Sequence, residues 1–195
     1  AVVSWTPPSV SGIGYEQDFE DPGFMSGAFS GDWQGDVVRV PSGTDGVTSA
    51  EGIAHAQVTE GAYTRLGGYS NMFGAGFTTS LDVYLDMTDP DVVSGDYFFD
   101  LTTAVSKQDG NHLRDFIYNV SSIGVPGQMF LRASNNASVI PASVITNSDN
   151  FYEVTSGGWY TFEWVFYNDA GALSCDFNLY DGSGTLVCTD TRSIA

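Results

Sequence analysis

The segment that decides the fold is Trp159-Tyr-Thr-Phe-Glu-Trp-Val-Phe-Tyr-Asn168. Phe162, Trp164 and Phe166 fall on one side of an extended chain, and Thr161, Glu163 and Tyr167 fall on the other. Successive side chains of a strand point to opposite faces, so this period of two indicates a strand with one buried and one partly exposed face. The segment 79–87 repeats the pattern, with Leu81, Val83 and Leu85 opposite Asp82, Tyr84 and Asp86.

Strand-like runs of this kind recur along the chain, and no segment of eleven or more residues shows the helical spacing of apolar residues. Glycine-rich turn pairs such as Asp-Gly and Ser-Gly separate the runs. Many short strands without helices predict an antiparallel β-sandwich or barrel made as one domain. The predicted strands are 15–20, 36–40, 53–58, 63–66, 77–86, 97–103, 113–120, 129–133, 152–155, 159–168, 173–180 and 185–190.

The first fourteen residues differ from the rest because they hold Pro7 and Pro8 and show little alternation. We therefore predict an extended N-terminal arm over residues 1–14 and a single sandwich domain over residues 15–195. The start at Ala1 suits a mature terminus after removal of a signal peptide. No apolar run approaches the roughly 18 residues of a membrane-spanning helix.

The charge balance excludes several partners. The chain has 195 residues, 24 acidic and 6 basic side chains, and a formal net charge of −18; Lys107 is its only lysine. Phosphate backbones need basic patches, so nucleic acid is excluded as a partner, and anionic membranes or polyuronates are disfavoured. Divalent cations are natural partners of such a surface, although the charge can also serve solubility alone.

The two cysteines, Cys175 and Cys188, flank a predicted hairpin. If Asp181-Gly182 forms a two-residue turn, Cys175 lies directly opposite Cys188, at a separation that suits a disulfide. A four-residue loop from Asp181 to Gly184 would shift this register and leave two free thiols. The disulfide, if formed, implies an oxidising compartment and therefore a secreted protein.

Eight stretches of the chain carry a resemblance to known proteins: 17–22, 43–52 with His55, 66–70, 79–86, 112–116, 133–136, 158–164 and 173–188. Their order resembles the concanavalin A-like (laminin G-like) jelly roll, and more narrowly a family of largely uncharacterised secreted bacterial proteins. This resemblance covers residues 15–191 and implies two packed sheets of a jelly-roll β-sandwich. Relatives carry a further stretch that closes the sheet beside the first strand. In this chain, which stops at Ala195, either that strand is missing or another segment supplies it, so a self-contained monomer is not expected.

Two acidic segments are candidate sites for a structural Ca²⁺ ion. The first is a glycine-containing turn between two strands, and such a turn can present carboxylate and carbonyl oxygens to Ca²⁺. It contains Asp89, Asp91 and Asp96. The second, Glu20 and Asp21, ends the first predicted strand, where similar sandwiches often hold an ion. The alternative is that both are solvated acidic loops.

A sugar-binding face is the second candidate site, because concanavalin A-like sandwiches that handle glycans use one sheet face. Aromatic rings beside carboxylates and amides suit sugars, which need apolar contact together with hydrogen-bond acceptors. The alternative is ordinary packing or a partner interface. The predicted set is Asp82, Tyr84, His112, Arg114, Tyr118, Glu163 and Tyr167.

Enzyme chemistry has weaker support. The nearest approach to the Glu-x-Asp-x-x-Glu strand of jelly-roll hydrolases is Glu16-Gln-Asp-Phe-Glu20, which has the wrong spacing. A lyase needs a tyrosine or histidine base with an arginine, and the net charge disfavours its anionic substrates. The residues available for such a set are Arg65, Tyr84, His112, Arg114 and Tyr118.

The sequence thus predicts a secreted, non-catalytic β-sandwich of the cell surface or extracellular matrix that binds polysaccharide or like subunits. The alternatives are a structural subunit of a filament, built when residues 1–14 add as a strand to a neighbouring subunit, and a polysaccharide-degrading lyase or hydrolase.

Overall fold

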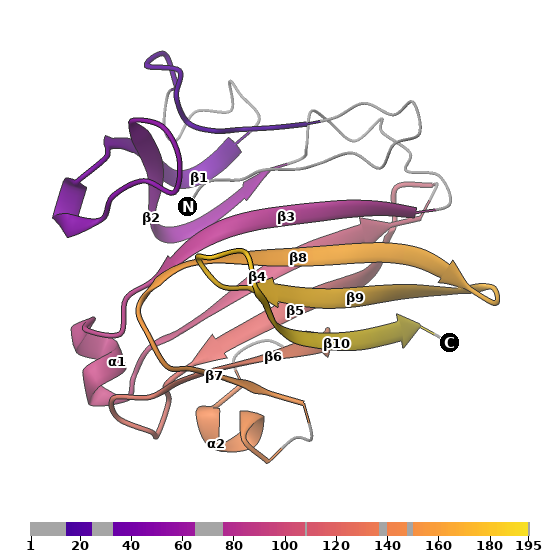
Figure 1. Cartoon of the computed structure of the whole chain (residues 1–195). Helices are drawn as coiled ribbons and strands as arrows, with labels where there is room; N and C mark the ends of the chain where they lie inside the picture. Colours follow the sequence, from indigo (N-terminus) through magenta and orange to yellow (C-terminus); the bar gives the residue numbers. More distant parts are fainter. Residues whose placement is uncertain are drawn as a thin grey trace.

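The computed structural model describes residues 15–24, 33–64, 76–107, 109–136, 140–147 and 150–194. These residues form an all-β protein of antiparallel sheets packed face to face, as the alternation predicts (Figure 1). Two sheets have four strands each, and a separate ribbon has two. The N-terminal arm that we predict over residues 1–14 lies outside the described residues.

The front sheet, which faces the viewer in Figure 1, has the strand order β10-β9-β8-β3. The back sheet has the order β4-β5-β6-β7, and the ribbon pairs β1 with β2. Eleven of the twelve predicted segments lie in or overlap these strands, and the segment 15–20 contributes only an isolated bridge at Gln17. The strands are β1 Trp33–Pro41, β2 Ala54–Thr64, β3 Gly76–Leu85, β4 Phe98–Ser106, β5 His112–Ser121, β6 Met129–Asn135, β7 Tyr152–Val154, β8 Gly158–Asp169, β9 Ala172–Tyr180 and β10 Leu186–Ile194.

The main core fills the space between the front and back sheets. Phe162, Trp164 and Phe166 of β8 are at most 3% exposed, and they pack against aromatic side chains of β5 such as Phe116. The predicted inner faces of β3 and β8 are therefore confirmed. Burying each large apolar side chain contributes about 1.5–3 kcal/mol, so this aromatic layer is the main source of stability.

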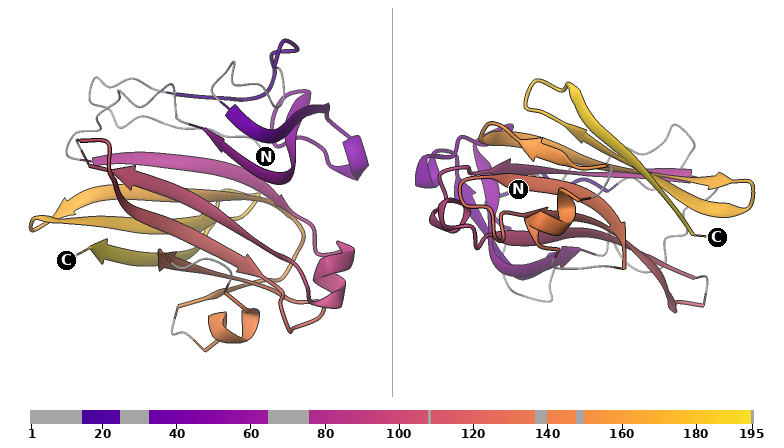
Figure 2. Two further views of the ribbon diagram at one scale, coloured as in Figure 1. Left: turned by 180° about the vertical axis from the view of Figure 1, so that it is seen from behind. Right: turned by 90° about the horizontal axis from the view of Figure 1, so that it is seen from below.

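The β1–β2 ribbon packs beside β3 at one edge of the front sheet, as Figures 1 and 2 show. Phe19, Val37 and Ala56 form a second small core there, and Leu81 of β3 packs against both cores. The indole Nε1 of Trp159 donates a hydrogen bond of 2.7 Å to the carbonyl of Thr48, in the loop between β1 and β2. The ribbon is thus attached to the front sheet by apolar and polar contacts.

Two short α-helices and one 3-10 turn depart from the expectation of a chain without helices. They are α1 Pro90–Ser94, α2 Ala142–Ile145 and η1 Thr44–Gly46. Asp89 caps α1 by accepting a hydrogen bond of 2.8 Å from the amide of Asp91, and Gly95 ends it at a φ of 82°. One or two turns are too short to show helical periodicity, although Asp-Pro at the start and Gly at the end are typical capping residues. No helix in the described segments is long and apolar enough to cross a lipid bilayer.

The predicted disulfide is wrong. Cys188 lies opposite Leu179, and Cys175 lies opposite Arg192, so both thiols are free. The reason is the turn, which is longer than Asp181-Gly182. The carboxylate of Asp181 accepts hydrogen bonds from the amides of Ser183 and Thr185, and a bulge follows between Leu186 and Cys188. The argument from a disulfide to an oxidising compartment therefore fails.

Candidate functional site

The outer face of the front sheet is the candidate site. Residues of β3 and β8 that alternate with the core-facing ones point away from the core, and these include the predicted Asp82, Tyr84, Glu163 and Tyr167. Figure 1 looks onto this face, and no described helix or strand lies over it. The cross-strand rows of the face are Asp82-Thr161-Tyr180, Ser80-Glu163-Asn178-Thr189, Thr78-Val165-Asp176-Thr191 and Gly76-Tyr167-Ser174-Ser193.

Glu163 is the centre of the first hydrogen-bond network on this face. Its Oε1 accepts a hydrogen bond of 2.9 Å from Nδ2 of Asn178 and one of 3.1 Å from the hydroxyl of Tyr180. Thr189 donates in turn to Oδ1 of Asn178 at 2.8 Å, which extends the network to β10. Burial raises the pKa of Tyr180, and the nearby Glu163 adds to this shift, so the phenol stays protonated and donates.

Asp176 of β9 is the centre of a second network. Its Oδ1 accepts hydrogen bonds from the hydroxyl of Tyr167 at 3.0 Å and from Oγ1 of Thr191 at 2.7 Å. The hydrogen bond to Asp176 raises the pKa of Tyr167, because it stabilises the neutral phenol. Two of the tyrosines on the face are thus held in fixed positions by carboxylates of a neighbouring strand.

Asp82 lies at the other side of the face, on β3. Its Oδ1 accepts a hydrogen bond of 2.5 Å from Oγ1 of Thr161. Burial raises the pKa of Asp82, and the bond from Thr161 opposes that shift only in part. Next to it, the rings of Tyr84 and Trp159 meet edge to face at a centroid distance of 5.6 Å.

The face combines three carboxylates with hydroxyl and amide groups, and the rows given above contain no lysine, arginine or histidine. Such a surface accepts hydrogen bonds from neutral polyols and repels anions. Thr161, Asp176, Asn178 and Tyr180 were not predicted as site residues. The alternation of β9 contains the signal for three of them, because Ser174, Asp176, Asn178 and Tyr180 share one side of that strand.

The other predicted sugar-binding residues lie on β5 of the back sheet, away from this face. Tyr118 is only 4% exposed and packs in the core against Phe162, Trp164 and Phe177. Its prediction as a face residue is therefore wrong. His112 is exposed and pairs with Asp115 at 2.9 Å, so it does not join the front-sheet group.

Arg114 lies opposite Val105 of β4 on the back sheet. The structure thus does not bring Tyr84 together with His112, Arg114 and Tyr118 as a lyase site would require. Arg65, the remaining member of that set, lies outside the described residues.

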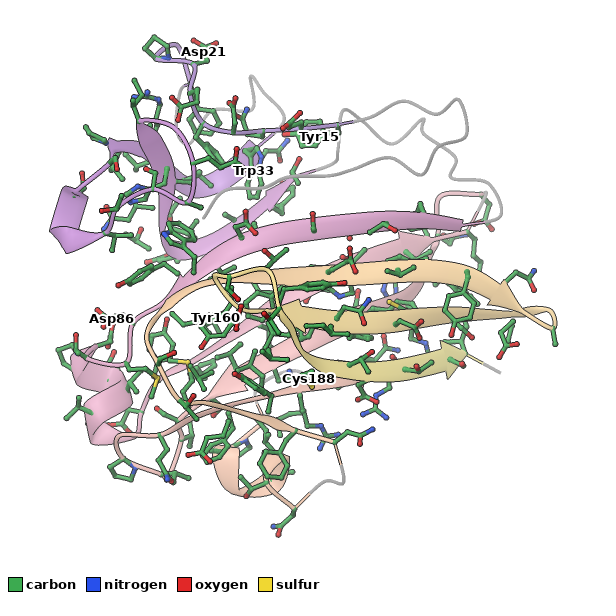
Figure 3. All side chains as sticks on the ribbon, viewed as in Figure 1. Tyr15, Asp21, Trp33, Asp86, Tyr160 and Cys188 are labelled. Carbon is green, nitrogen blue, oxygen red and sulfur yellow. The ribbon has the colours of Figure 1, made fainter. Side chains whose placement is uncertain are left out.

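The predicted calcium residues occupy two separate places. Figure 3 shows Asp21 above the β1–β2 ribbon, whereas Asp86 lies beside α1, the helix that contains Asp91. The carboxylate of Glu20 accepts hydrogen bonds from the amides of Ile53 and Ala54, at 2.9 and 3.1 Å.

Around α1, Asp89 acts as the helix cap, and Asp96 accepts a hydrogen bond of 3.1 Å from Ser94. Within the described ranges, no three His, Cys, Asp or Glu side chains are grouped to hold an ion. Calcium binding at either segment stays a prediction.

A buried Ser–His pair lies at the junction of the ribbon and the front sheet. The Oγ of Ser49 and Nδ1 of His55 are 3.0 Å apart, and both side chains are under 9% exposed. The His55 ring contacts Trp159 edge to face. Burial lowers the pKa of His55, so the ring is neutral at pH 7. The pair joins the β1–β2 loop to the start of β2, and the ring contact with Trp159 connects it to the front sheet.

Comparison with known proteins adds no relative: no family model matches the chain, and neither a curated protein nor a solved structure matches it significantly.

Proposed function

We propose that this chain is a secreted, non-catalytic β-sandwich of the cell surface or extracellular matrix, and that it binds a neutral polysaccharide on the outer face of its front sheet. The observation that carries the proposal is the pair of hydrogen-bond networks centred on Glu163 and Asp176. They hold tyrosine rings, an amide and carboxylate oxygens in fixed positions on an open surface.

The fixed positions favour binding because a side chain that is already ordered loses little conformational entropy when a ligand arrives. The rings offer apolar contact to sugar faces, while the carboxylates accept hydrogen bonds from sugar hydroxyls. An open sheet face suits a long polymer better than a small molecule, which needs a concave pocket. The negative charge of the face selects neutral glycans over uronates and sulfated glycans.

The test is binding of the purified chain to a panel of neutral and anionic polysaccharides, by affinity electrophoresis and calorimetry. We expect binding to neutral members only. Glu163→Gln and Asp176→Asn should each weaken it about tenfold or more, because hydrogen bonds to a charged acceptor are worth roughly 1.5–3 kcal/mol. Asp115→Asn, on the back sheet, is the matched control and should bind as the unaltered chain does. If the folded protein binds no polysaccharide of the panel, the proposal is refuted.

The same incubations test the enzyme alternative. Asp82 and Glu163 lie on neighbouring strands of one face, in adjacent cross-strand rows, because Glu163 pairs with Ser80 and Asp82 pairs with Thr161. If sugar products are released, and Glu163→Gln abolishes the release without loss of binding, the chain is a hydrolase or lyase and not a binding module.

The filament alternative predicts long assemblies in electron micrographs of the purified chain, since head-to-tail strand addition by residues 1–14 does not form a closed ring.

Secretion is tested by fractionation of the producing cells. A structural Ca²⁺ ion predicts a higher melting temperature in Ca²⁺ than in chelator, and equal melting temperatures would exclude it. An experimental structure that traces every strand connection tests the concanavalin A-like jelly roll, and any other connectivity would exclude it.

A further inference from the structure

In the described part of the chain, β10 is an edge strand of the front sheet. Side chains reach it at two points: Nδ2 of Asn135 donates to the carbonyl of Ser193 at 3.3 Å, and Nδ2 of Asn150 donates to Oδ1 of Asp190 at 3.0 Å. In the part of the chain that the structure describes, β10 pairs only with β9, whereas β3 at the other edge lies against the β1–β2 ribbon. After the bulge between Leu186 and Cys188, the ladder with β9 is regular from Cys188 to Ile194. That stretch contains no proline, lysine or bulge. Its protection is the inward-pointing charges of Asp190 and Arg192, which disfavour pairing with another chain in any register that leaves them unmatched.

The side chains of this stretch divide into two kinds. Thr189, Thr191 and Ser193 are small and exposed on the outer face. Asp190 and Arg192 are on the inner side, where Asp190 is 7% exposed and its Oδ2 lies 2.6 Å from Nη2 of Arg192. The edge strand therefore carries one negative and one positive charge on the same side, two residues apart.

This spacing is self-complementary. When two copies of β10 pair antiparallel with both cores on the same side, directly opposite residues have numbers with an even sum. A two-fold axis at Thr191 then places Asp190 opposite the second copy's Arg192, and Arg192 opposite the second copy's Asp190. An axis at Asp190 or at Arg192 would instead place identical charges opposite each other, which is unfavourable.

We propose that a second copy of this chain pairs with the β10 edge in the register that centres on Thr191. The hydrogen bonds of Arg192 within the described residues, to Asp190 and to the carbonyl of Ala133, both come from Nη2. Nη1 is then available to the second copy's Asp190. The two front sheets join into one continuous sheet, and the two outer faces become one surface.

The partner is a second copy because the charge pattern matches itself only under a two-fold rotation, which closes the assembly at two subunits. Seven residues from each chain form the pairing, so the interface is small and the dimer dissociates on dilution. Light scattering on the full chain should show a mass that rises from 20.9 kDa toward twice that value as concentration increases.

Cysteine cross-linking tests the register. Thr191→Cys places two thiols directly opposite each other, about 4.5–5.5 Å apart at Cβ, and mild oxidation should link the dimer through them. Thr189→Cys is the matched control: Thr189 is equally exposed and donates to a β9 side chain as Thr191 does, but it lies opposite the second copy's Ser193. Equal cross-linking of the two variants would overturn the register, and a monomer at every soluble concentration would overturn the dimer.

Charge-reversal variants of Asp190 and Arg192 distinguish loss of pairing between two copies from damage to the fold of one copy. Arg192→Glu gives a chain that repels its own copies, as does Asp190→Lys, and we expect each to dimerise about tenfold or more weakly. A mixture of the two variants restores both opposite-charge pairs, so it should form heterodimers at the concentration where the unaltered chain dimerises. If the mixture stays monomeric while both variants are folded by circular dichroism, the proposal is wrong. Long polymers in place of dimers would assign the edge to residues 1–14 of a neighbour.

Discussion

Replacing Tyr118 distinguishes a core residue from a ligand-binding one, because the sequence placed it on the sugar-binding face and the structure places it in the core. Its ring lies 4.9–5.0 Å from those of Phe162, Trp164 and Phe177, and its hydroxyl donates to the carbonyl of Glu163 at 3.2 Å. Tyr118→Ala removes all three ring contacts and leaves a cavity. We expect a loss of about 3–5 kcal/mol in the free energy of unfolding, the usual range for a buried aromatic residue.

The smaller change, Tyr118→Phe, keeps the ring and removes one hydrogen bond, which is worth about 0.5–1.5 kcal/mol. For a chain of this length, about 1 kcal/mol corresponds to roughly 2–4 °C in melting temperature. Thermal melts followed by circular dichroism should therefore fall by about 6–20 °C for the alanine variant and about 1–6 °C for the phenylalanine variant.

Tyr167→Ala on the outer face serves as the control. We expect its free energy of unfolding to fall by only about 0.5–1.5 kcal/mol, the worth of its hydrogen bond to Asp176, while polysaccharide binding weakens. The reasoning is wrong if Tyr118→Ala has the same melting temperature as the unaltered chain but no longer binds polysaccharide. That pair of results would put Tyr118 on the ligand side of the sheet.

Three further predictions follow from buried groups. Mass spectrometry after alkylation in denaturant, without reductant, should find both Cys175 and Cys188 modified. Burial raises the pKa of each thiol, so the native chain should react slowly. A disulfide-linked pair that stays unmodified would contradict the observed register. Because the pKa of His55 is lowered, the folded state binds fewer protons than the unfolded state below about pH 6.5. The free energy of unfolding from urea titrations should therefore fall as pH drops through that range, and a slope that persists in His55→Asn would assign it elsewhere. Because the pKa of Asp82 is raised, its protonated carboxyl stabilises the folded state at acid pH, and this contribution is lost as pH rises. Asp82→Asn should therefore raise the melting temperature at pH 7 and change it little at acid pH. A lower melting temperature at pH 7 would show that the hydrogen bond from Thr161 outweighs the cost of desolvation.

Alternation predicted the strands well because it is a local property with a strong physical cause. The inner residues of β3 and β8 were identified from sequence because their other faces carry polar side chains, so only one side can be buried. The same rule failed on β5, where Ile117 and Asn119 are buried on one face and Phe116 and Tyr118 on the other. With both faces buried, the pattern no longer shows which one meets the core.

The register of the β9–β10 hairpin could not be predicted because turn length depends on side-chain hydrogen bonds that the Asp-Gly pair does not reveal. Asp181 accepts from two backbone amides and from the hydroxyl of Ser183, and these bonds stabilise the longer loop. Adding residues to the turn moves every later residue of β10 along β9. The longer turn therefore separates the two cysteines, and it places Thr191 and Thr189 beside Asp176 and Asn178.

The two proposals, which have separate tests, are coupled through the geometry of β10. Thr189 and Thr191 belong to the networks of the outer face, and they lie in the strand that we propose to pair with a second copy. A dimer then holds two binding faces side by side on one sheet, so a polymer bound to the first face reaches the second at a high effective concentration. Apparent affinity for a long polysaccharide should therefore rise with protein concentration, while affinity for a short oligosaccharide should not. Cross-linked Thr191→Cys should keep the higher affinity on dilution, and if it binds long chains no better than the reduced monomer, the two faces do not act on one ligand.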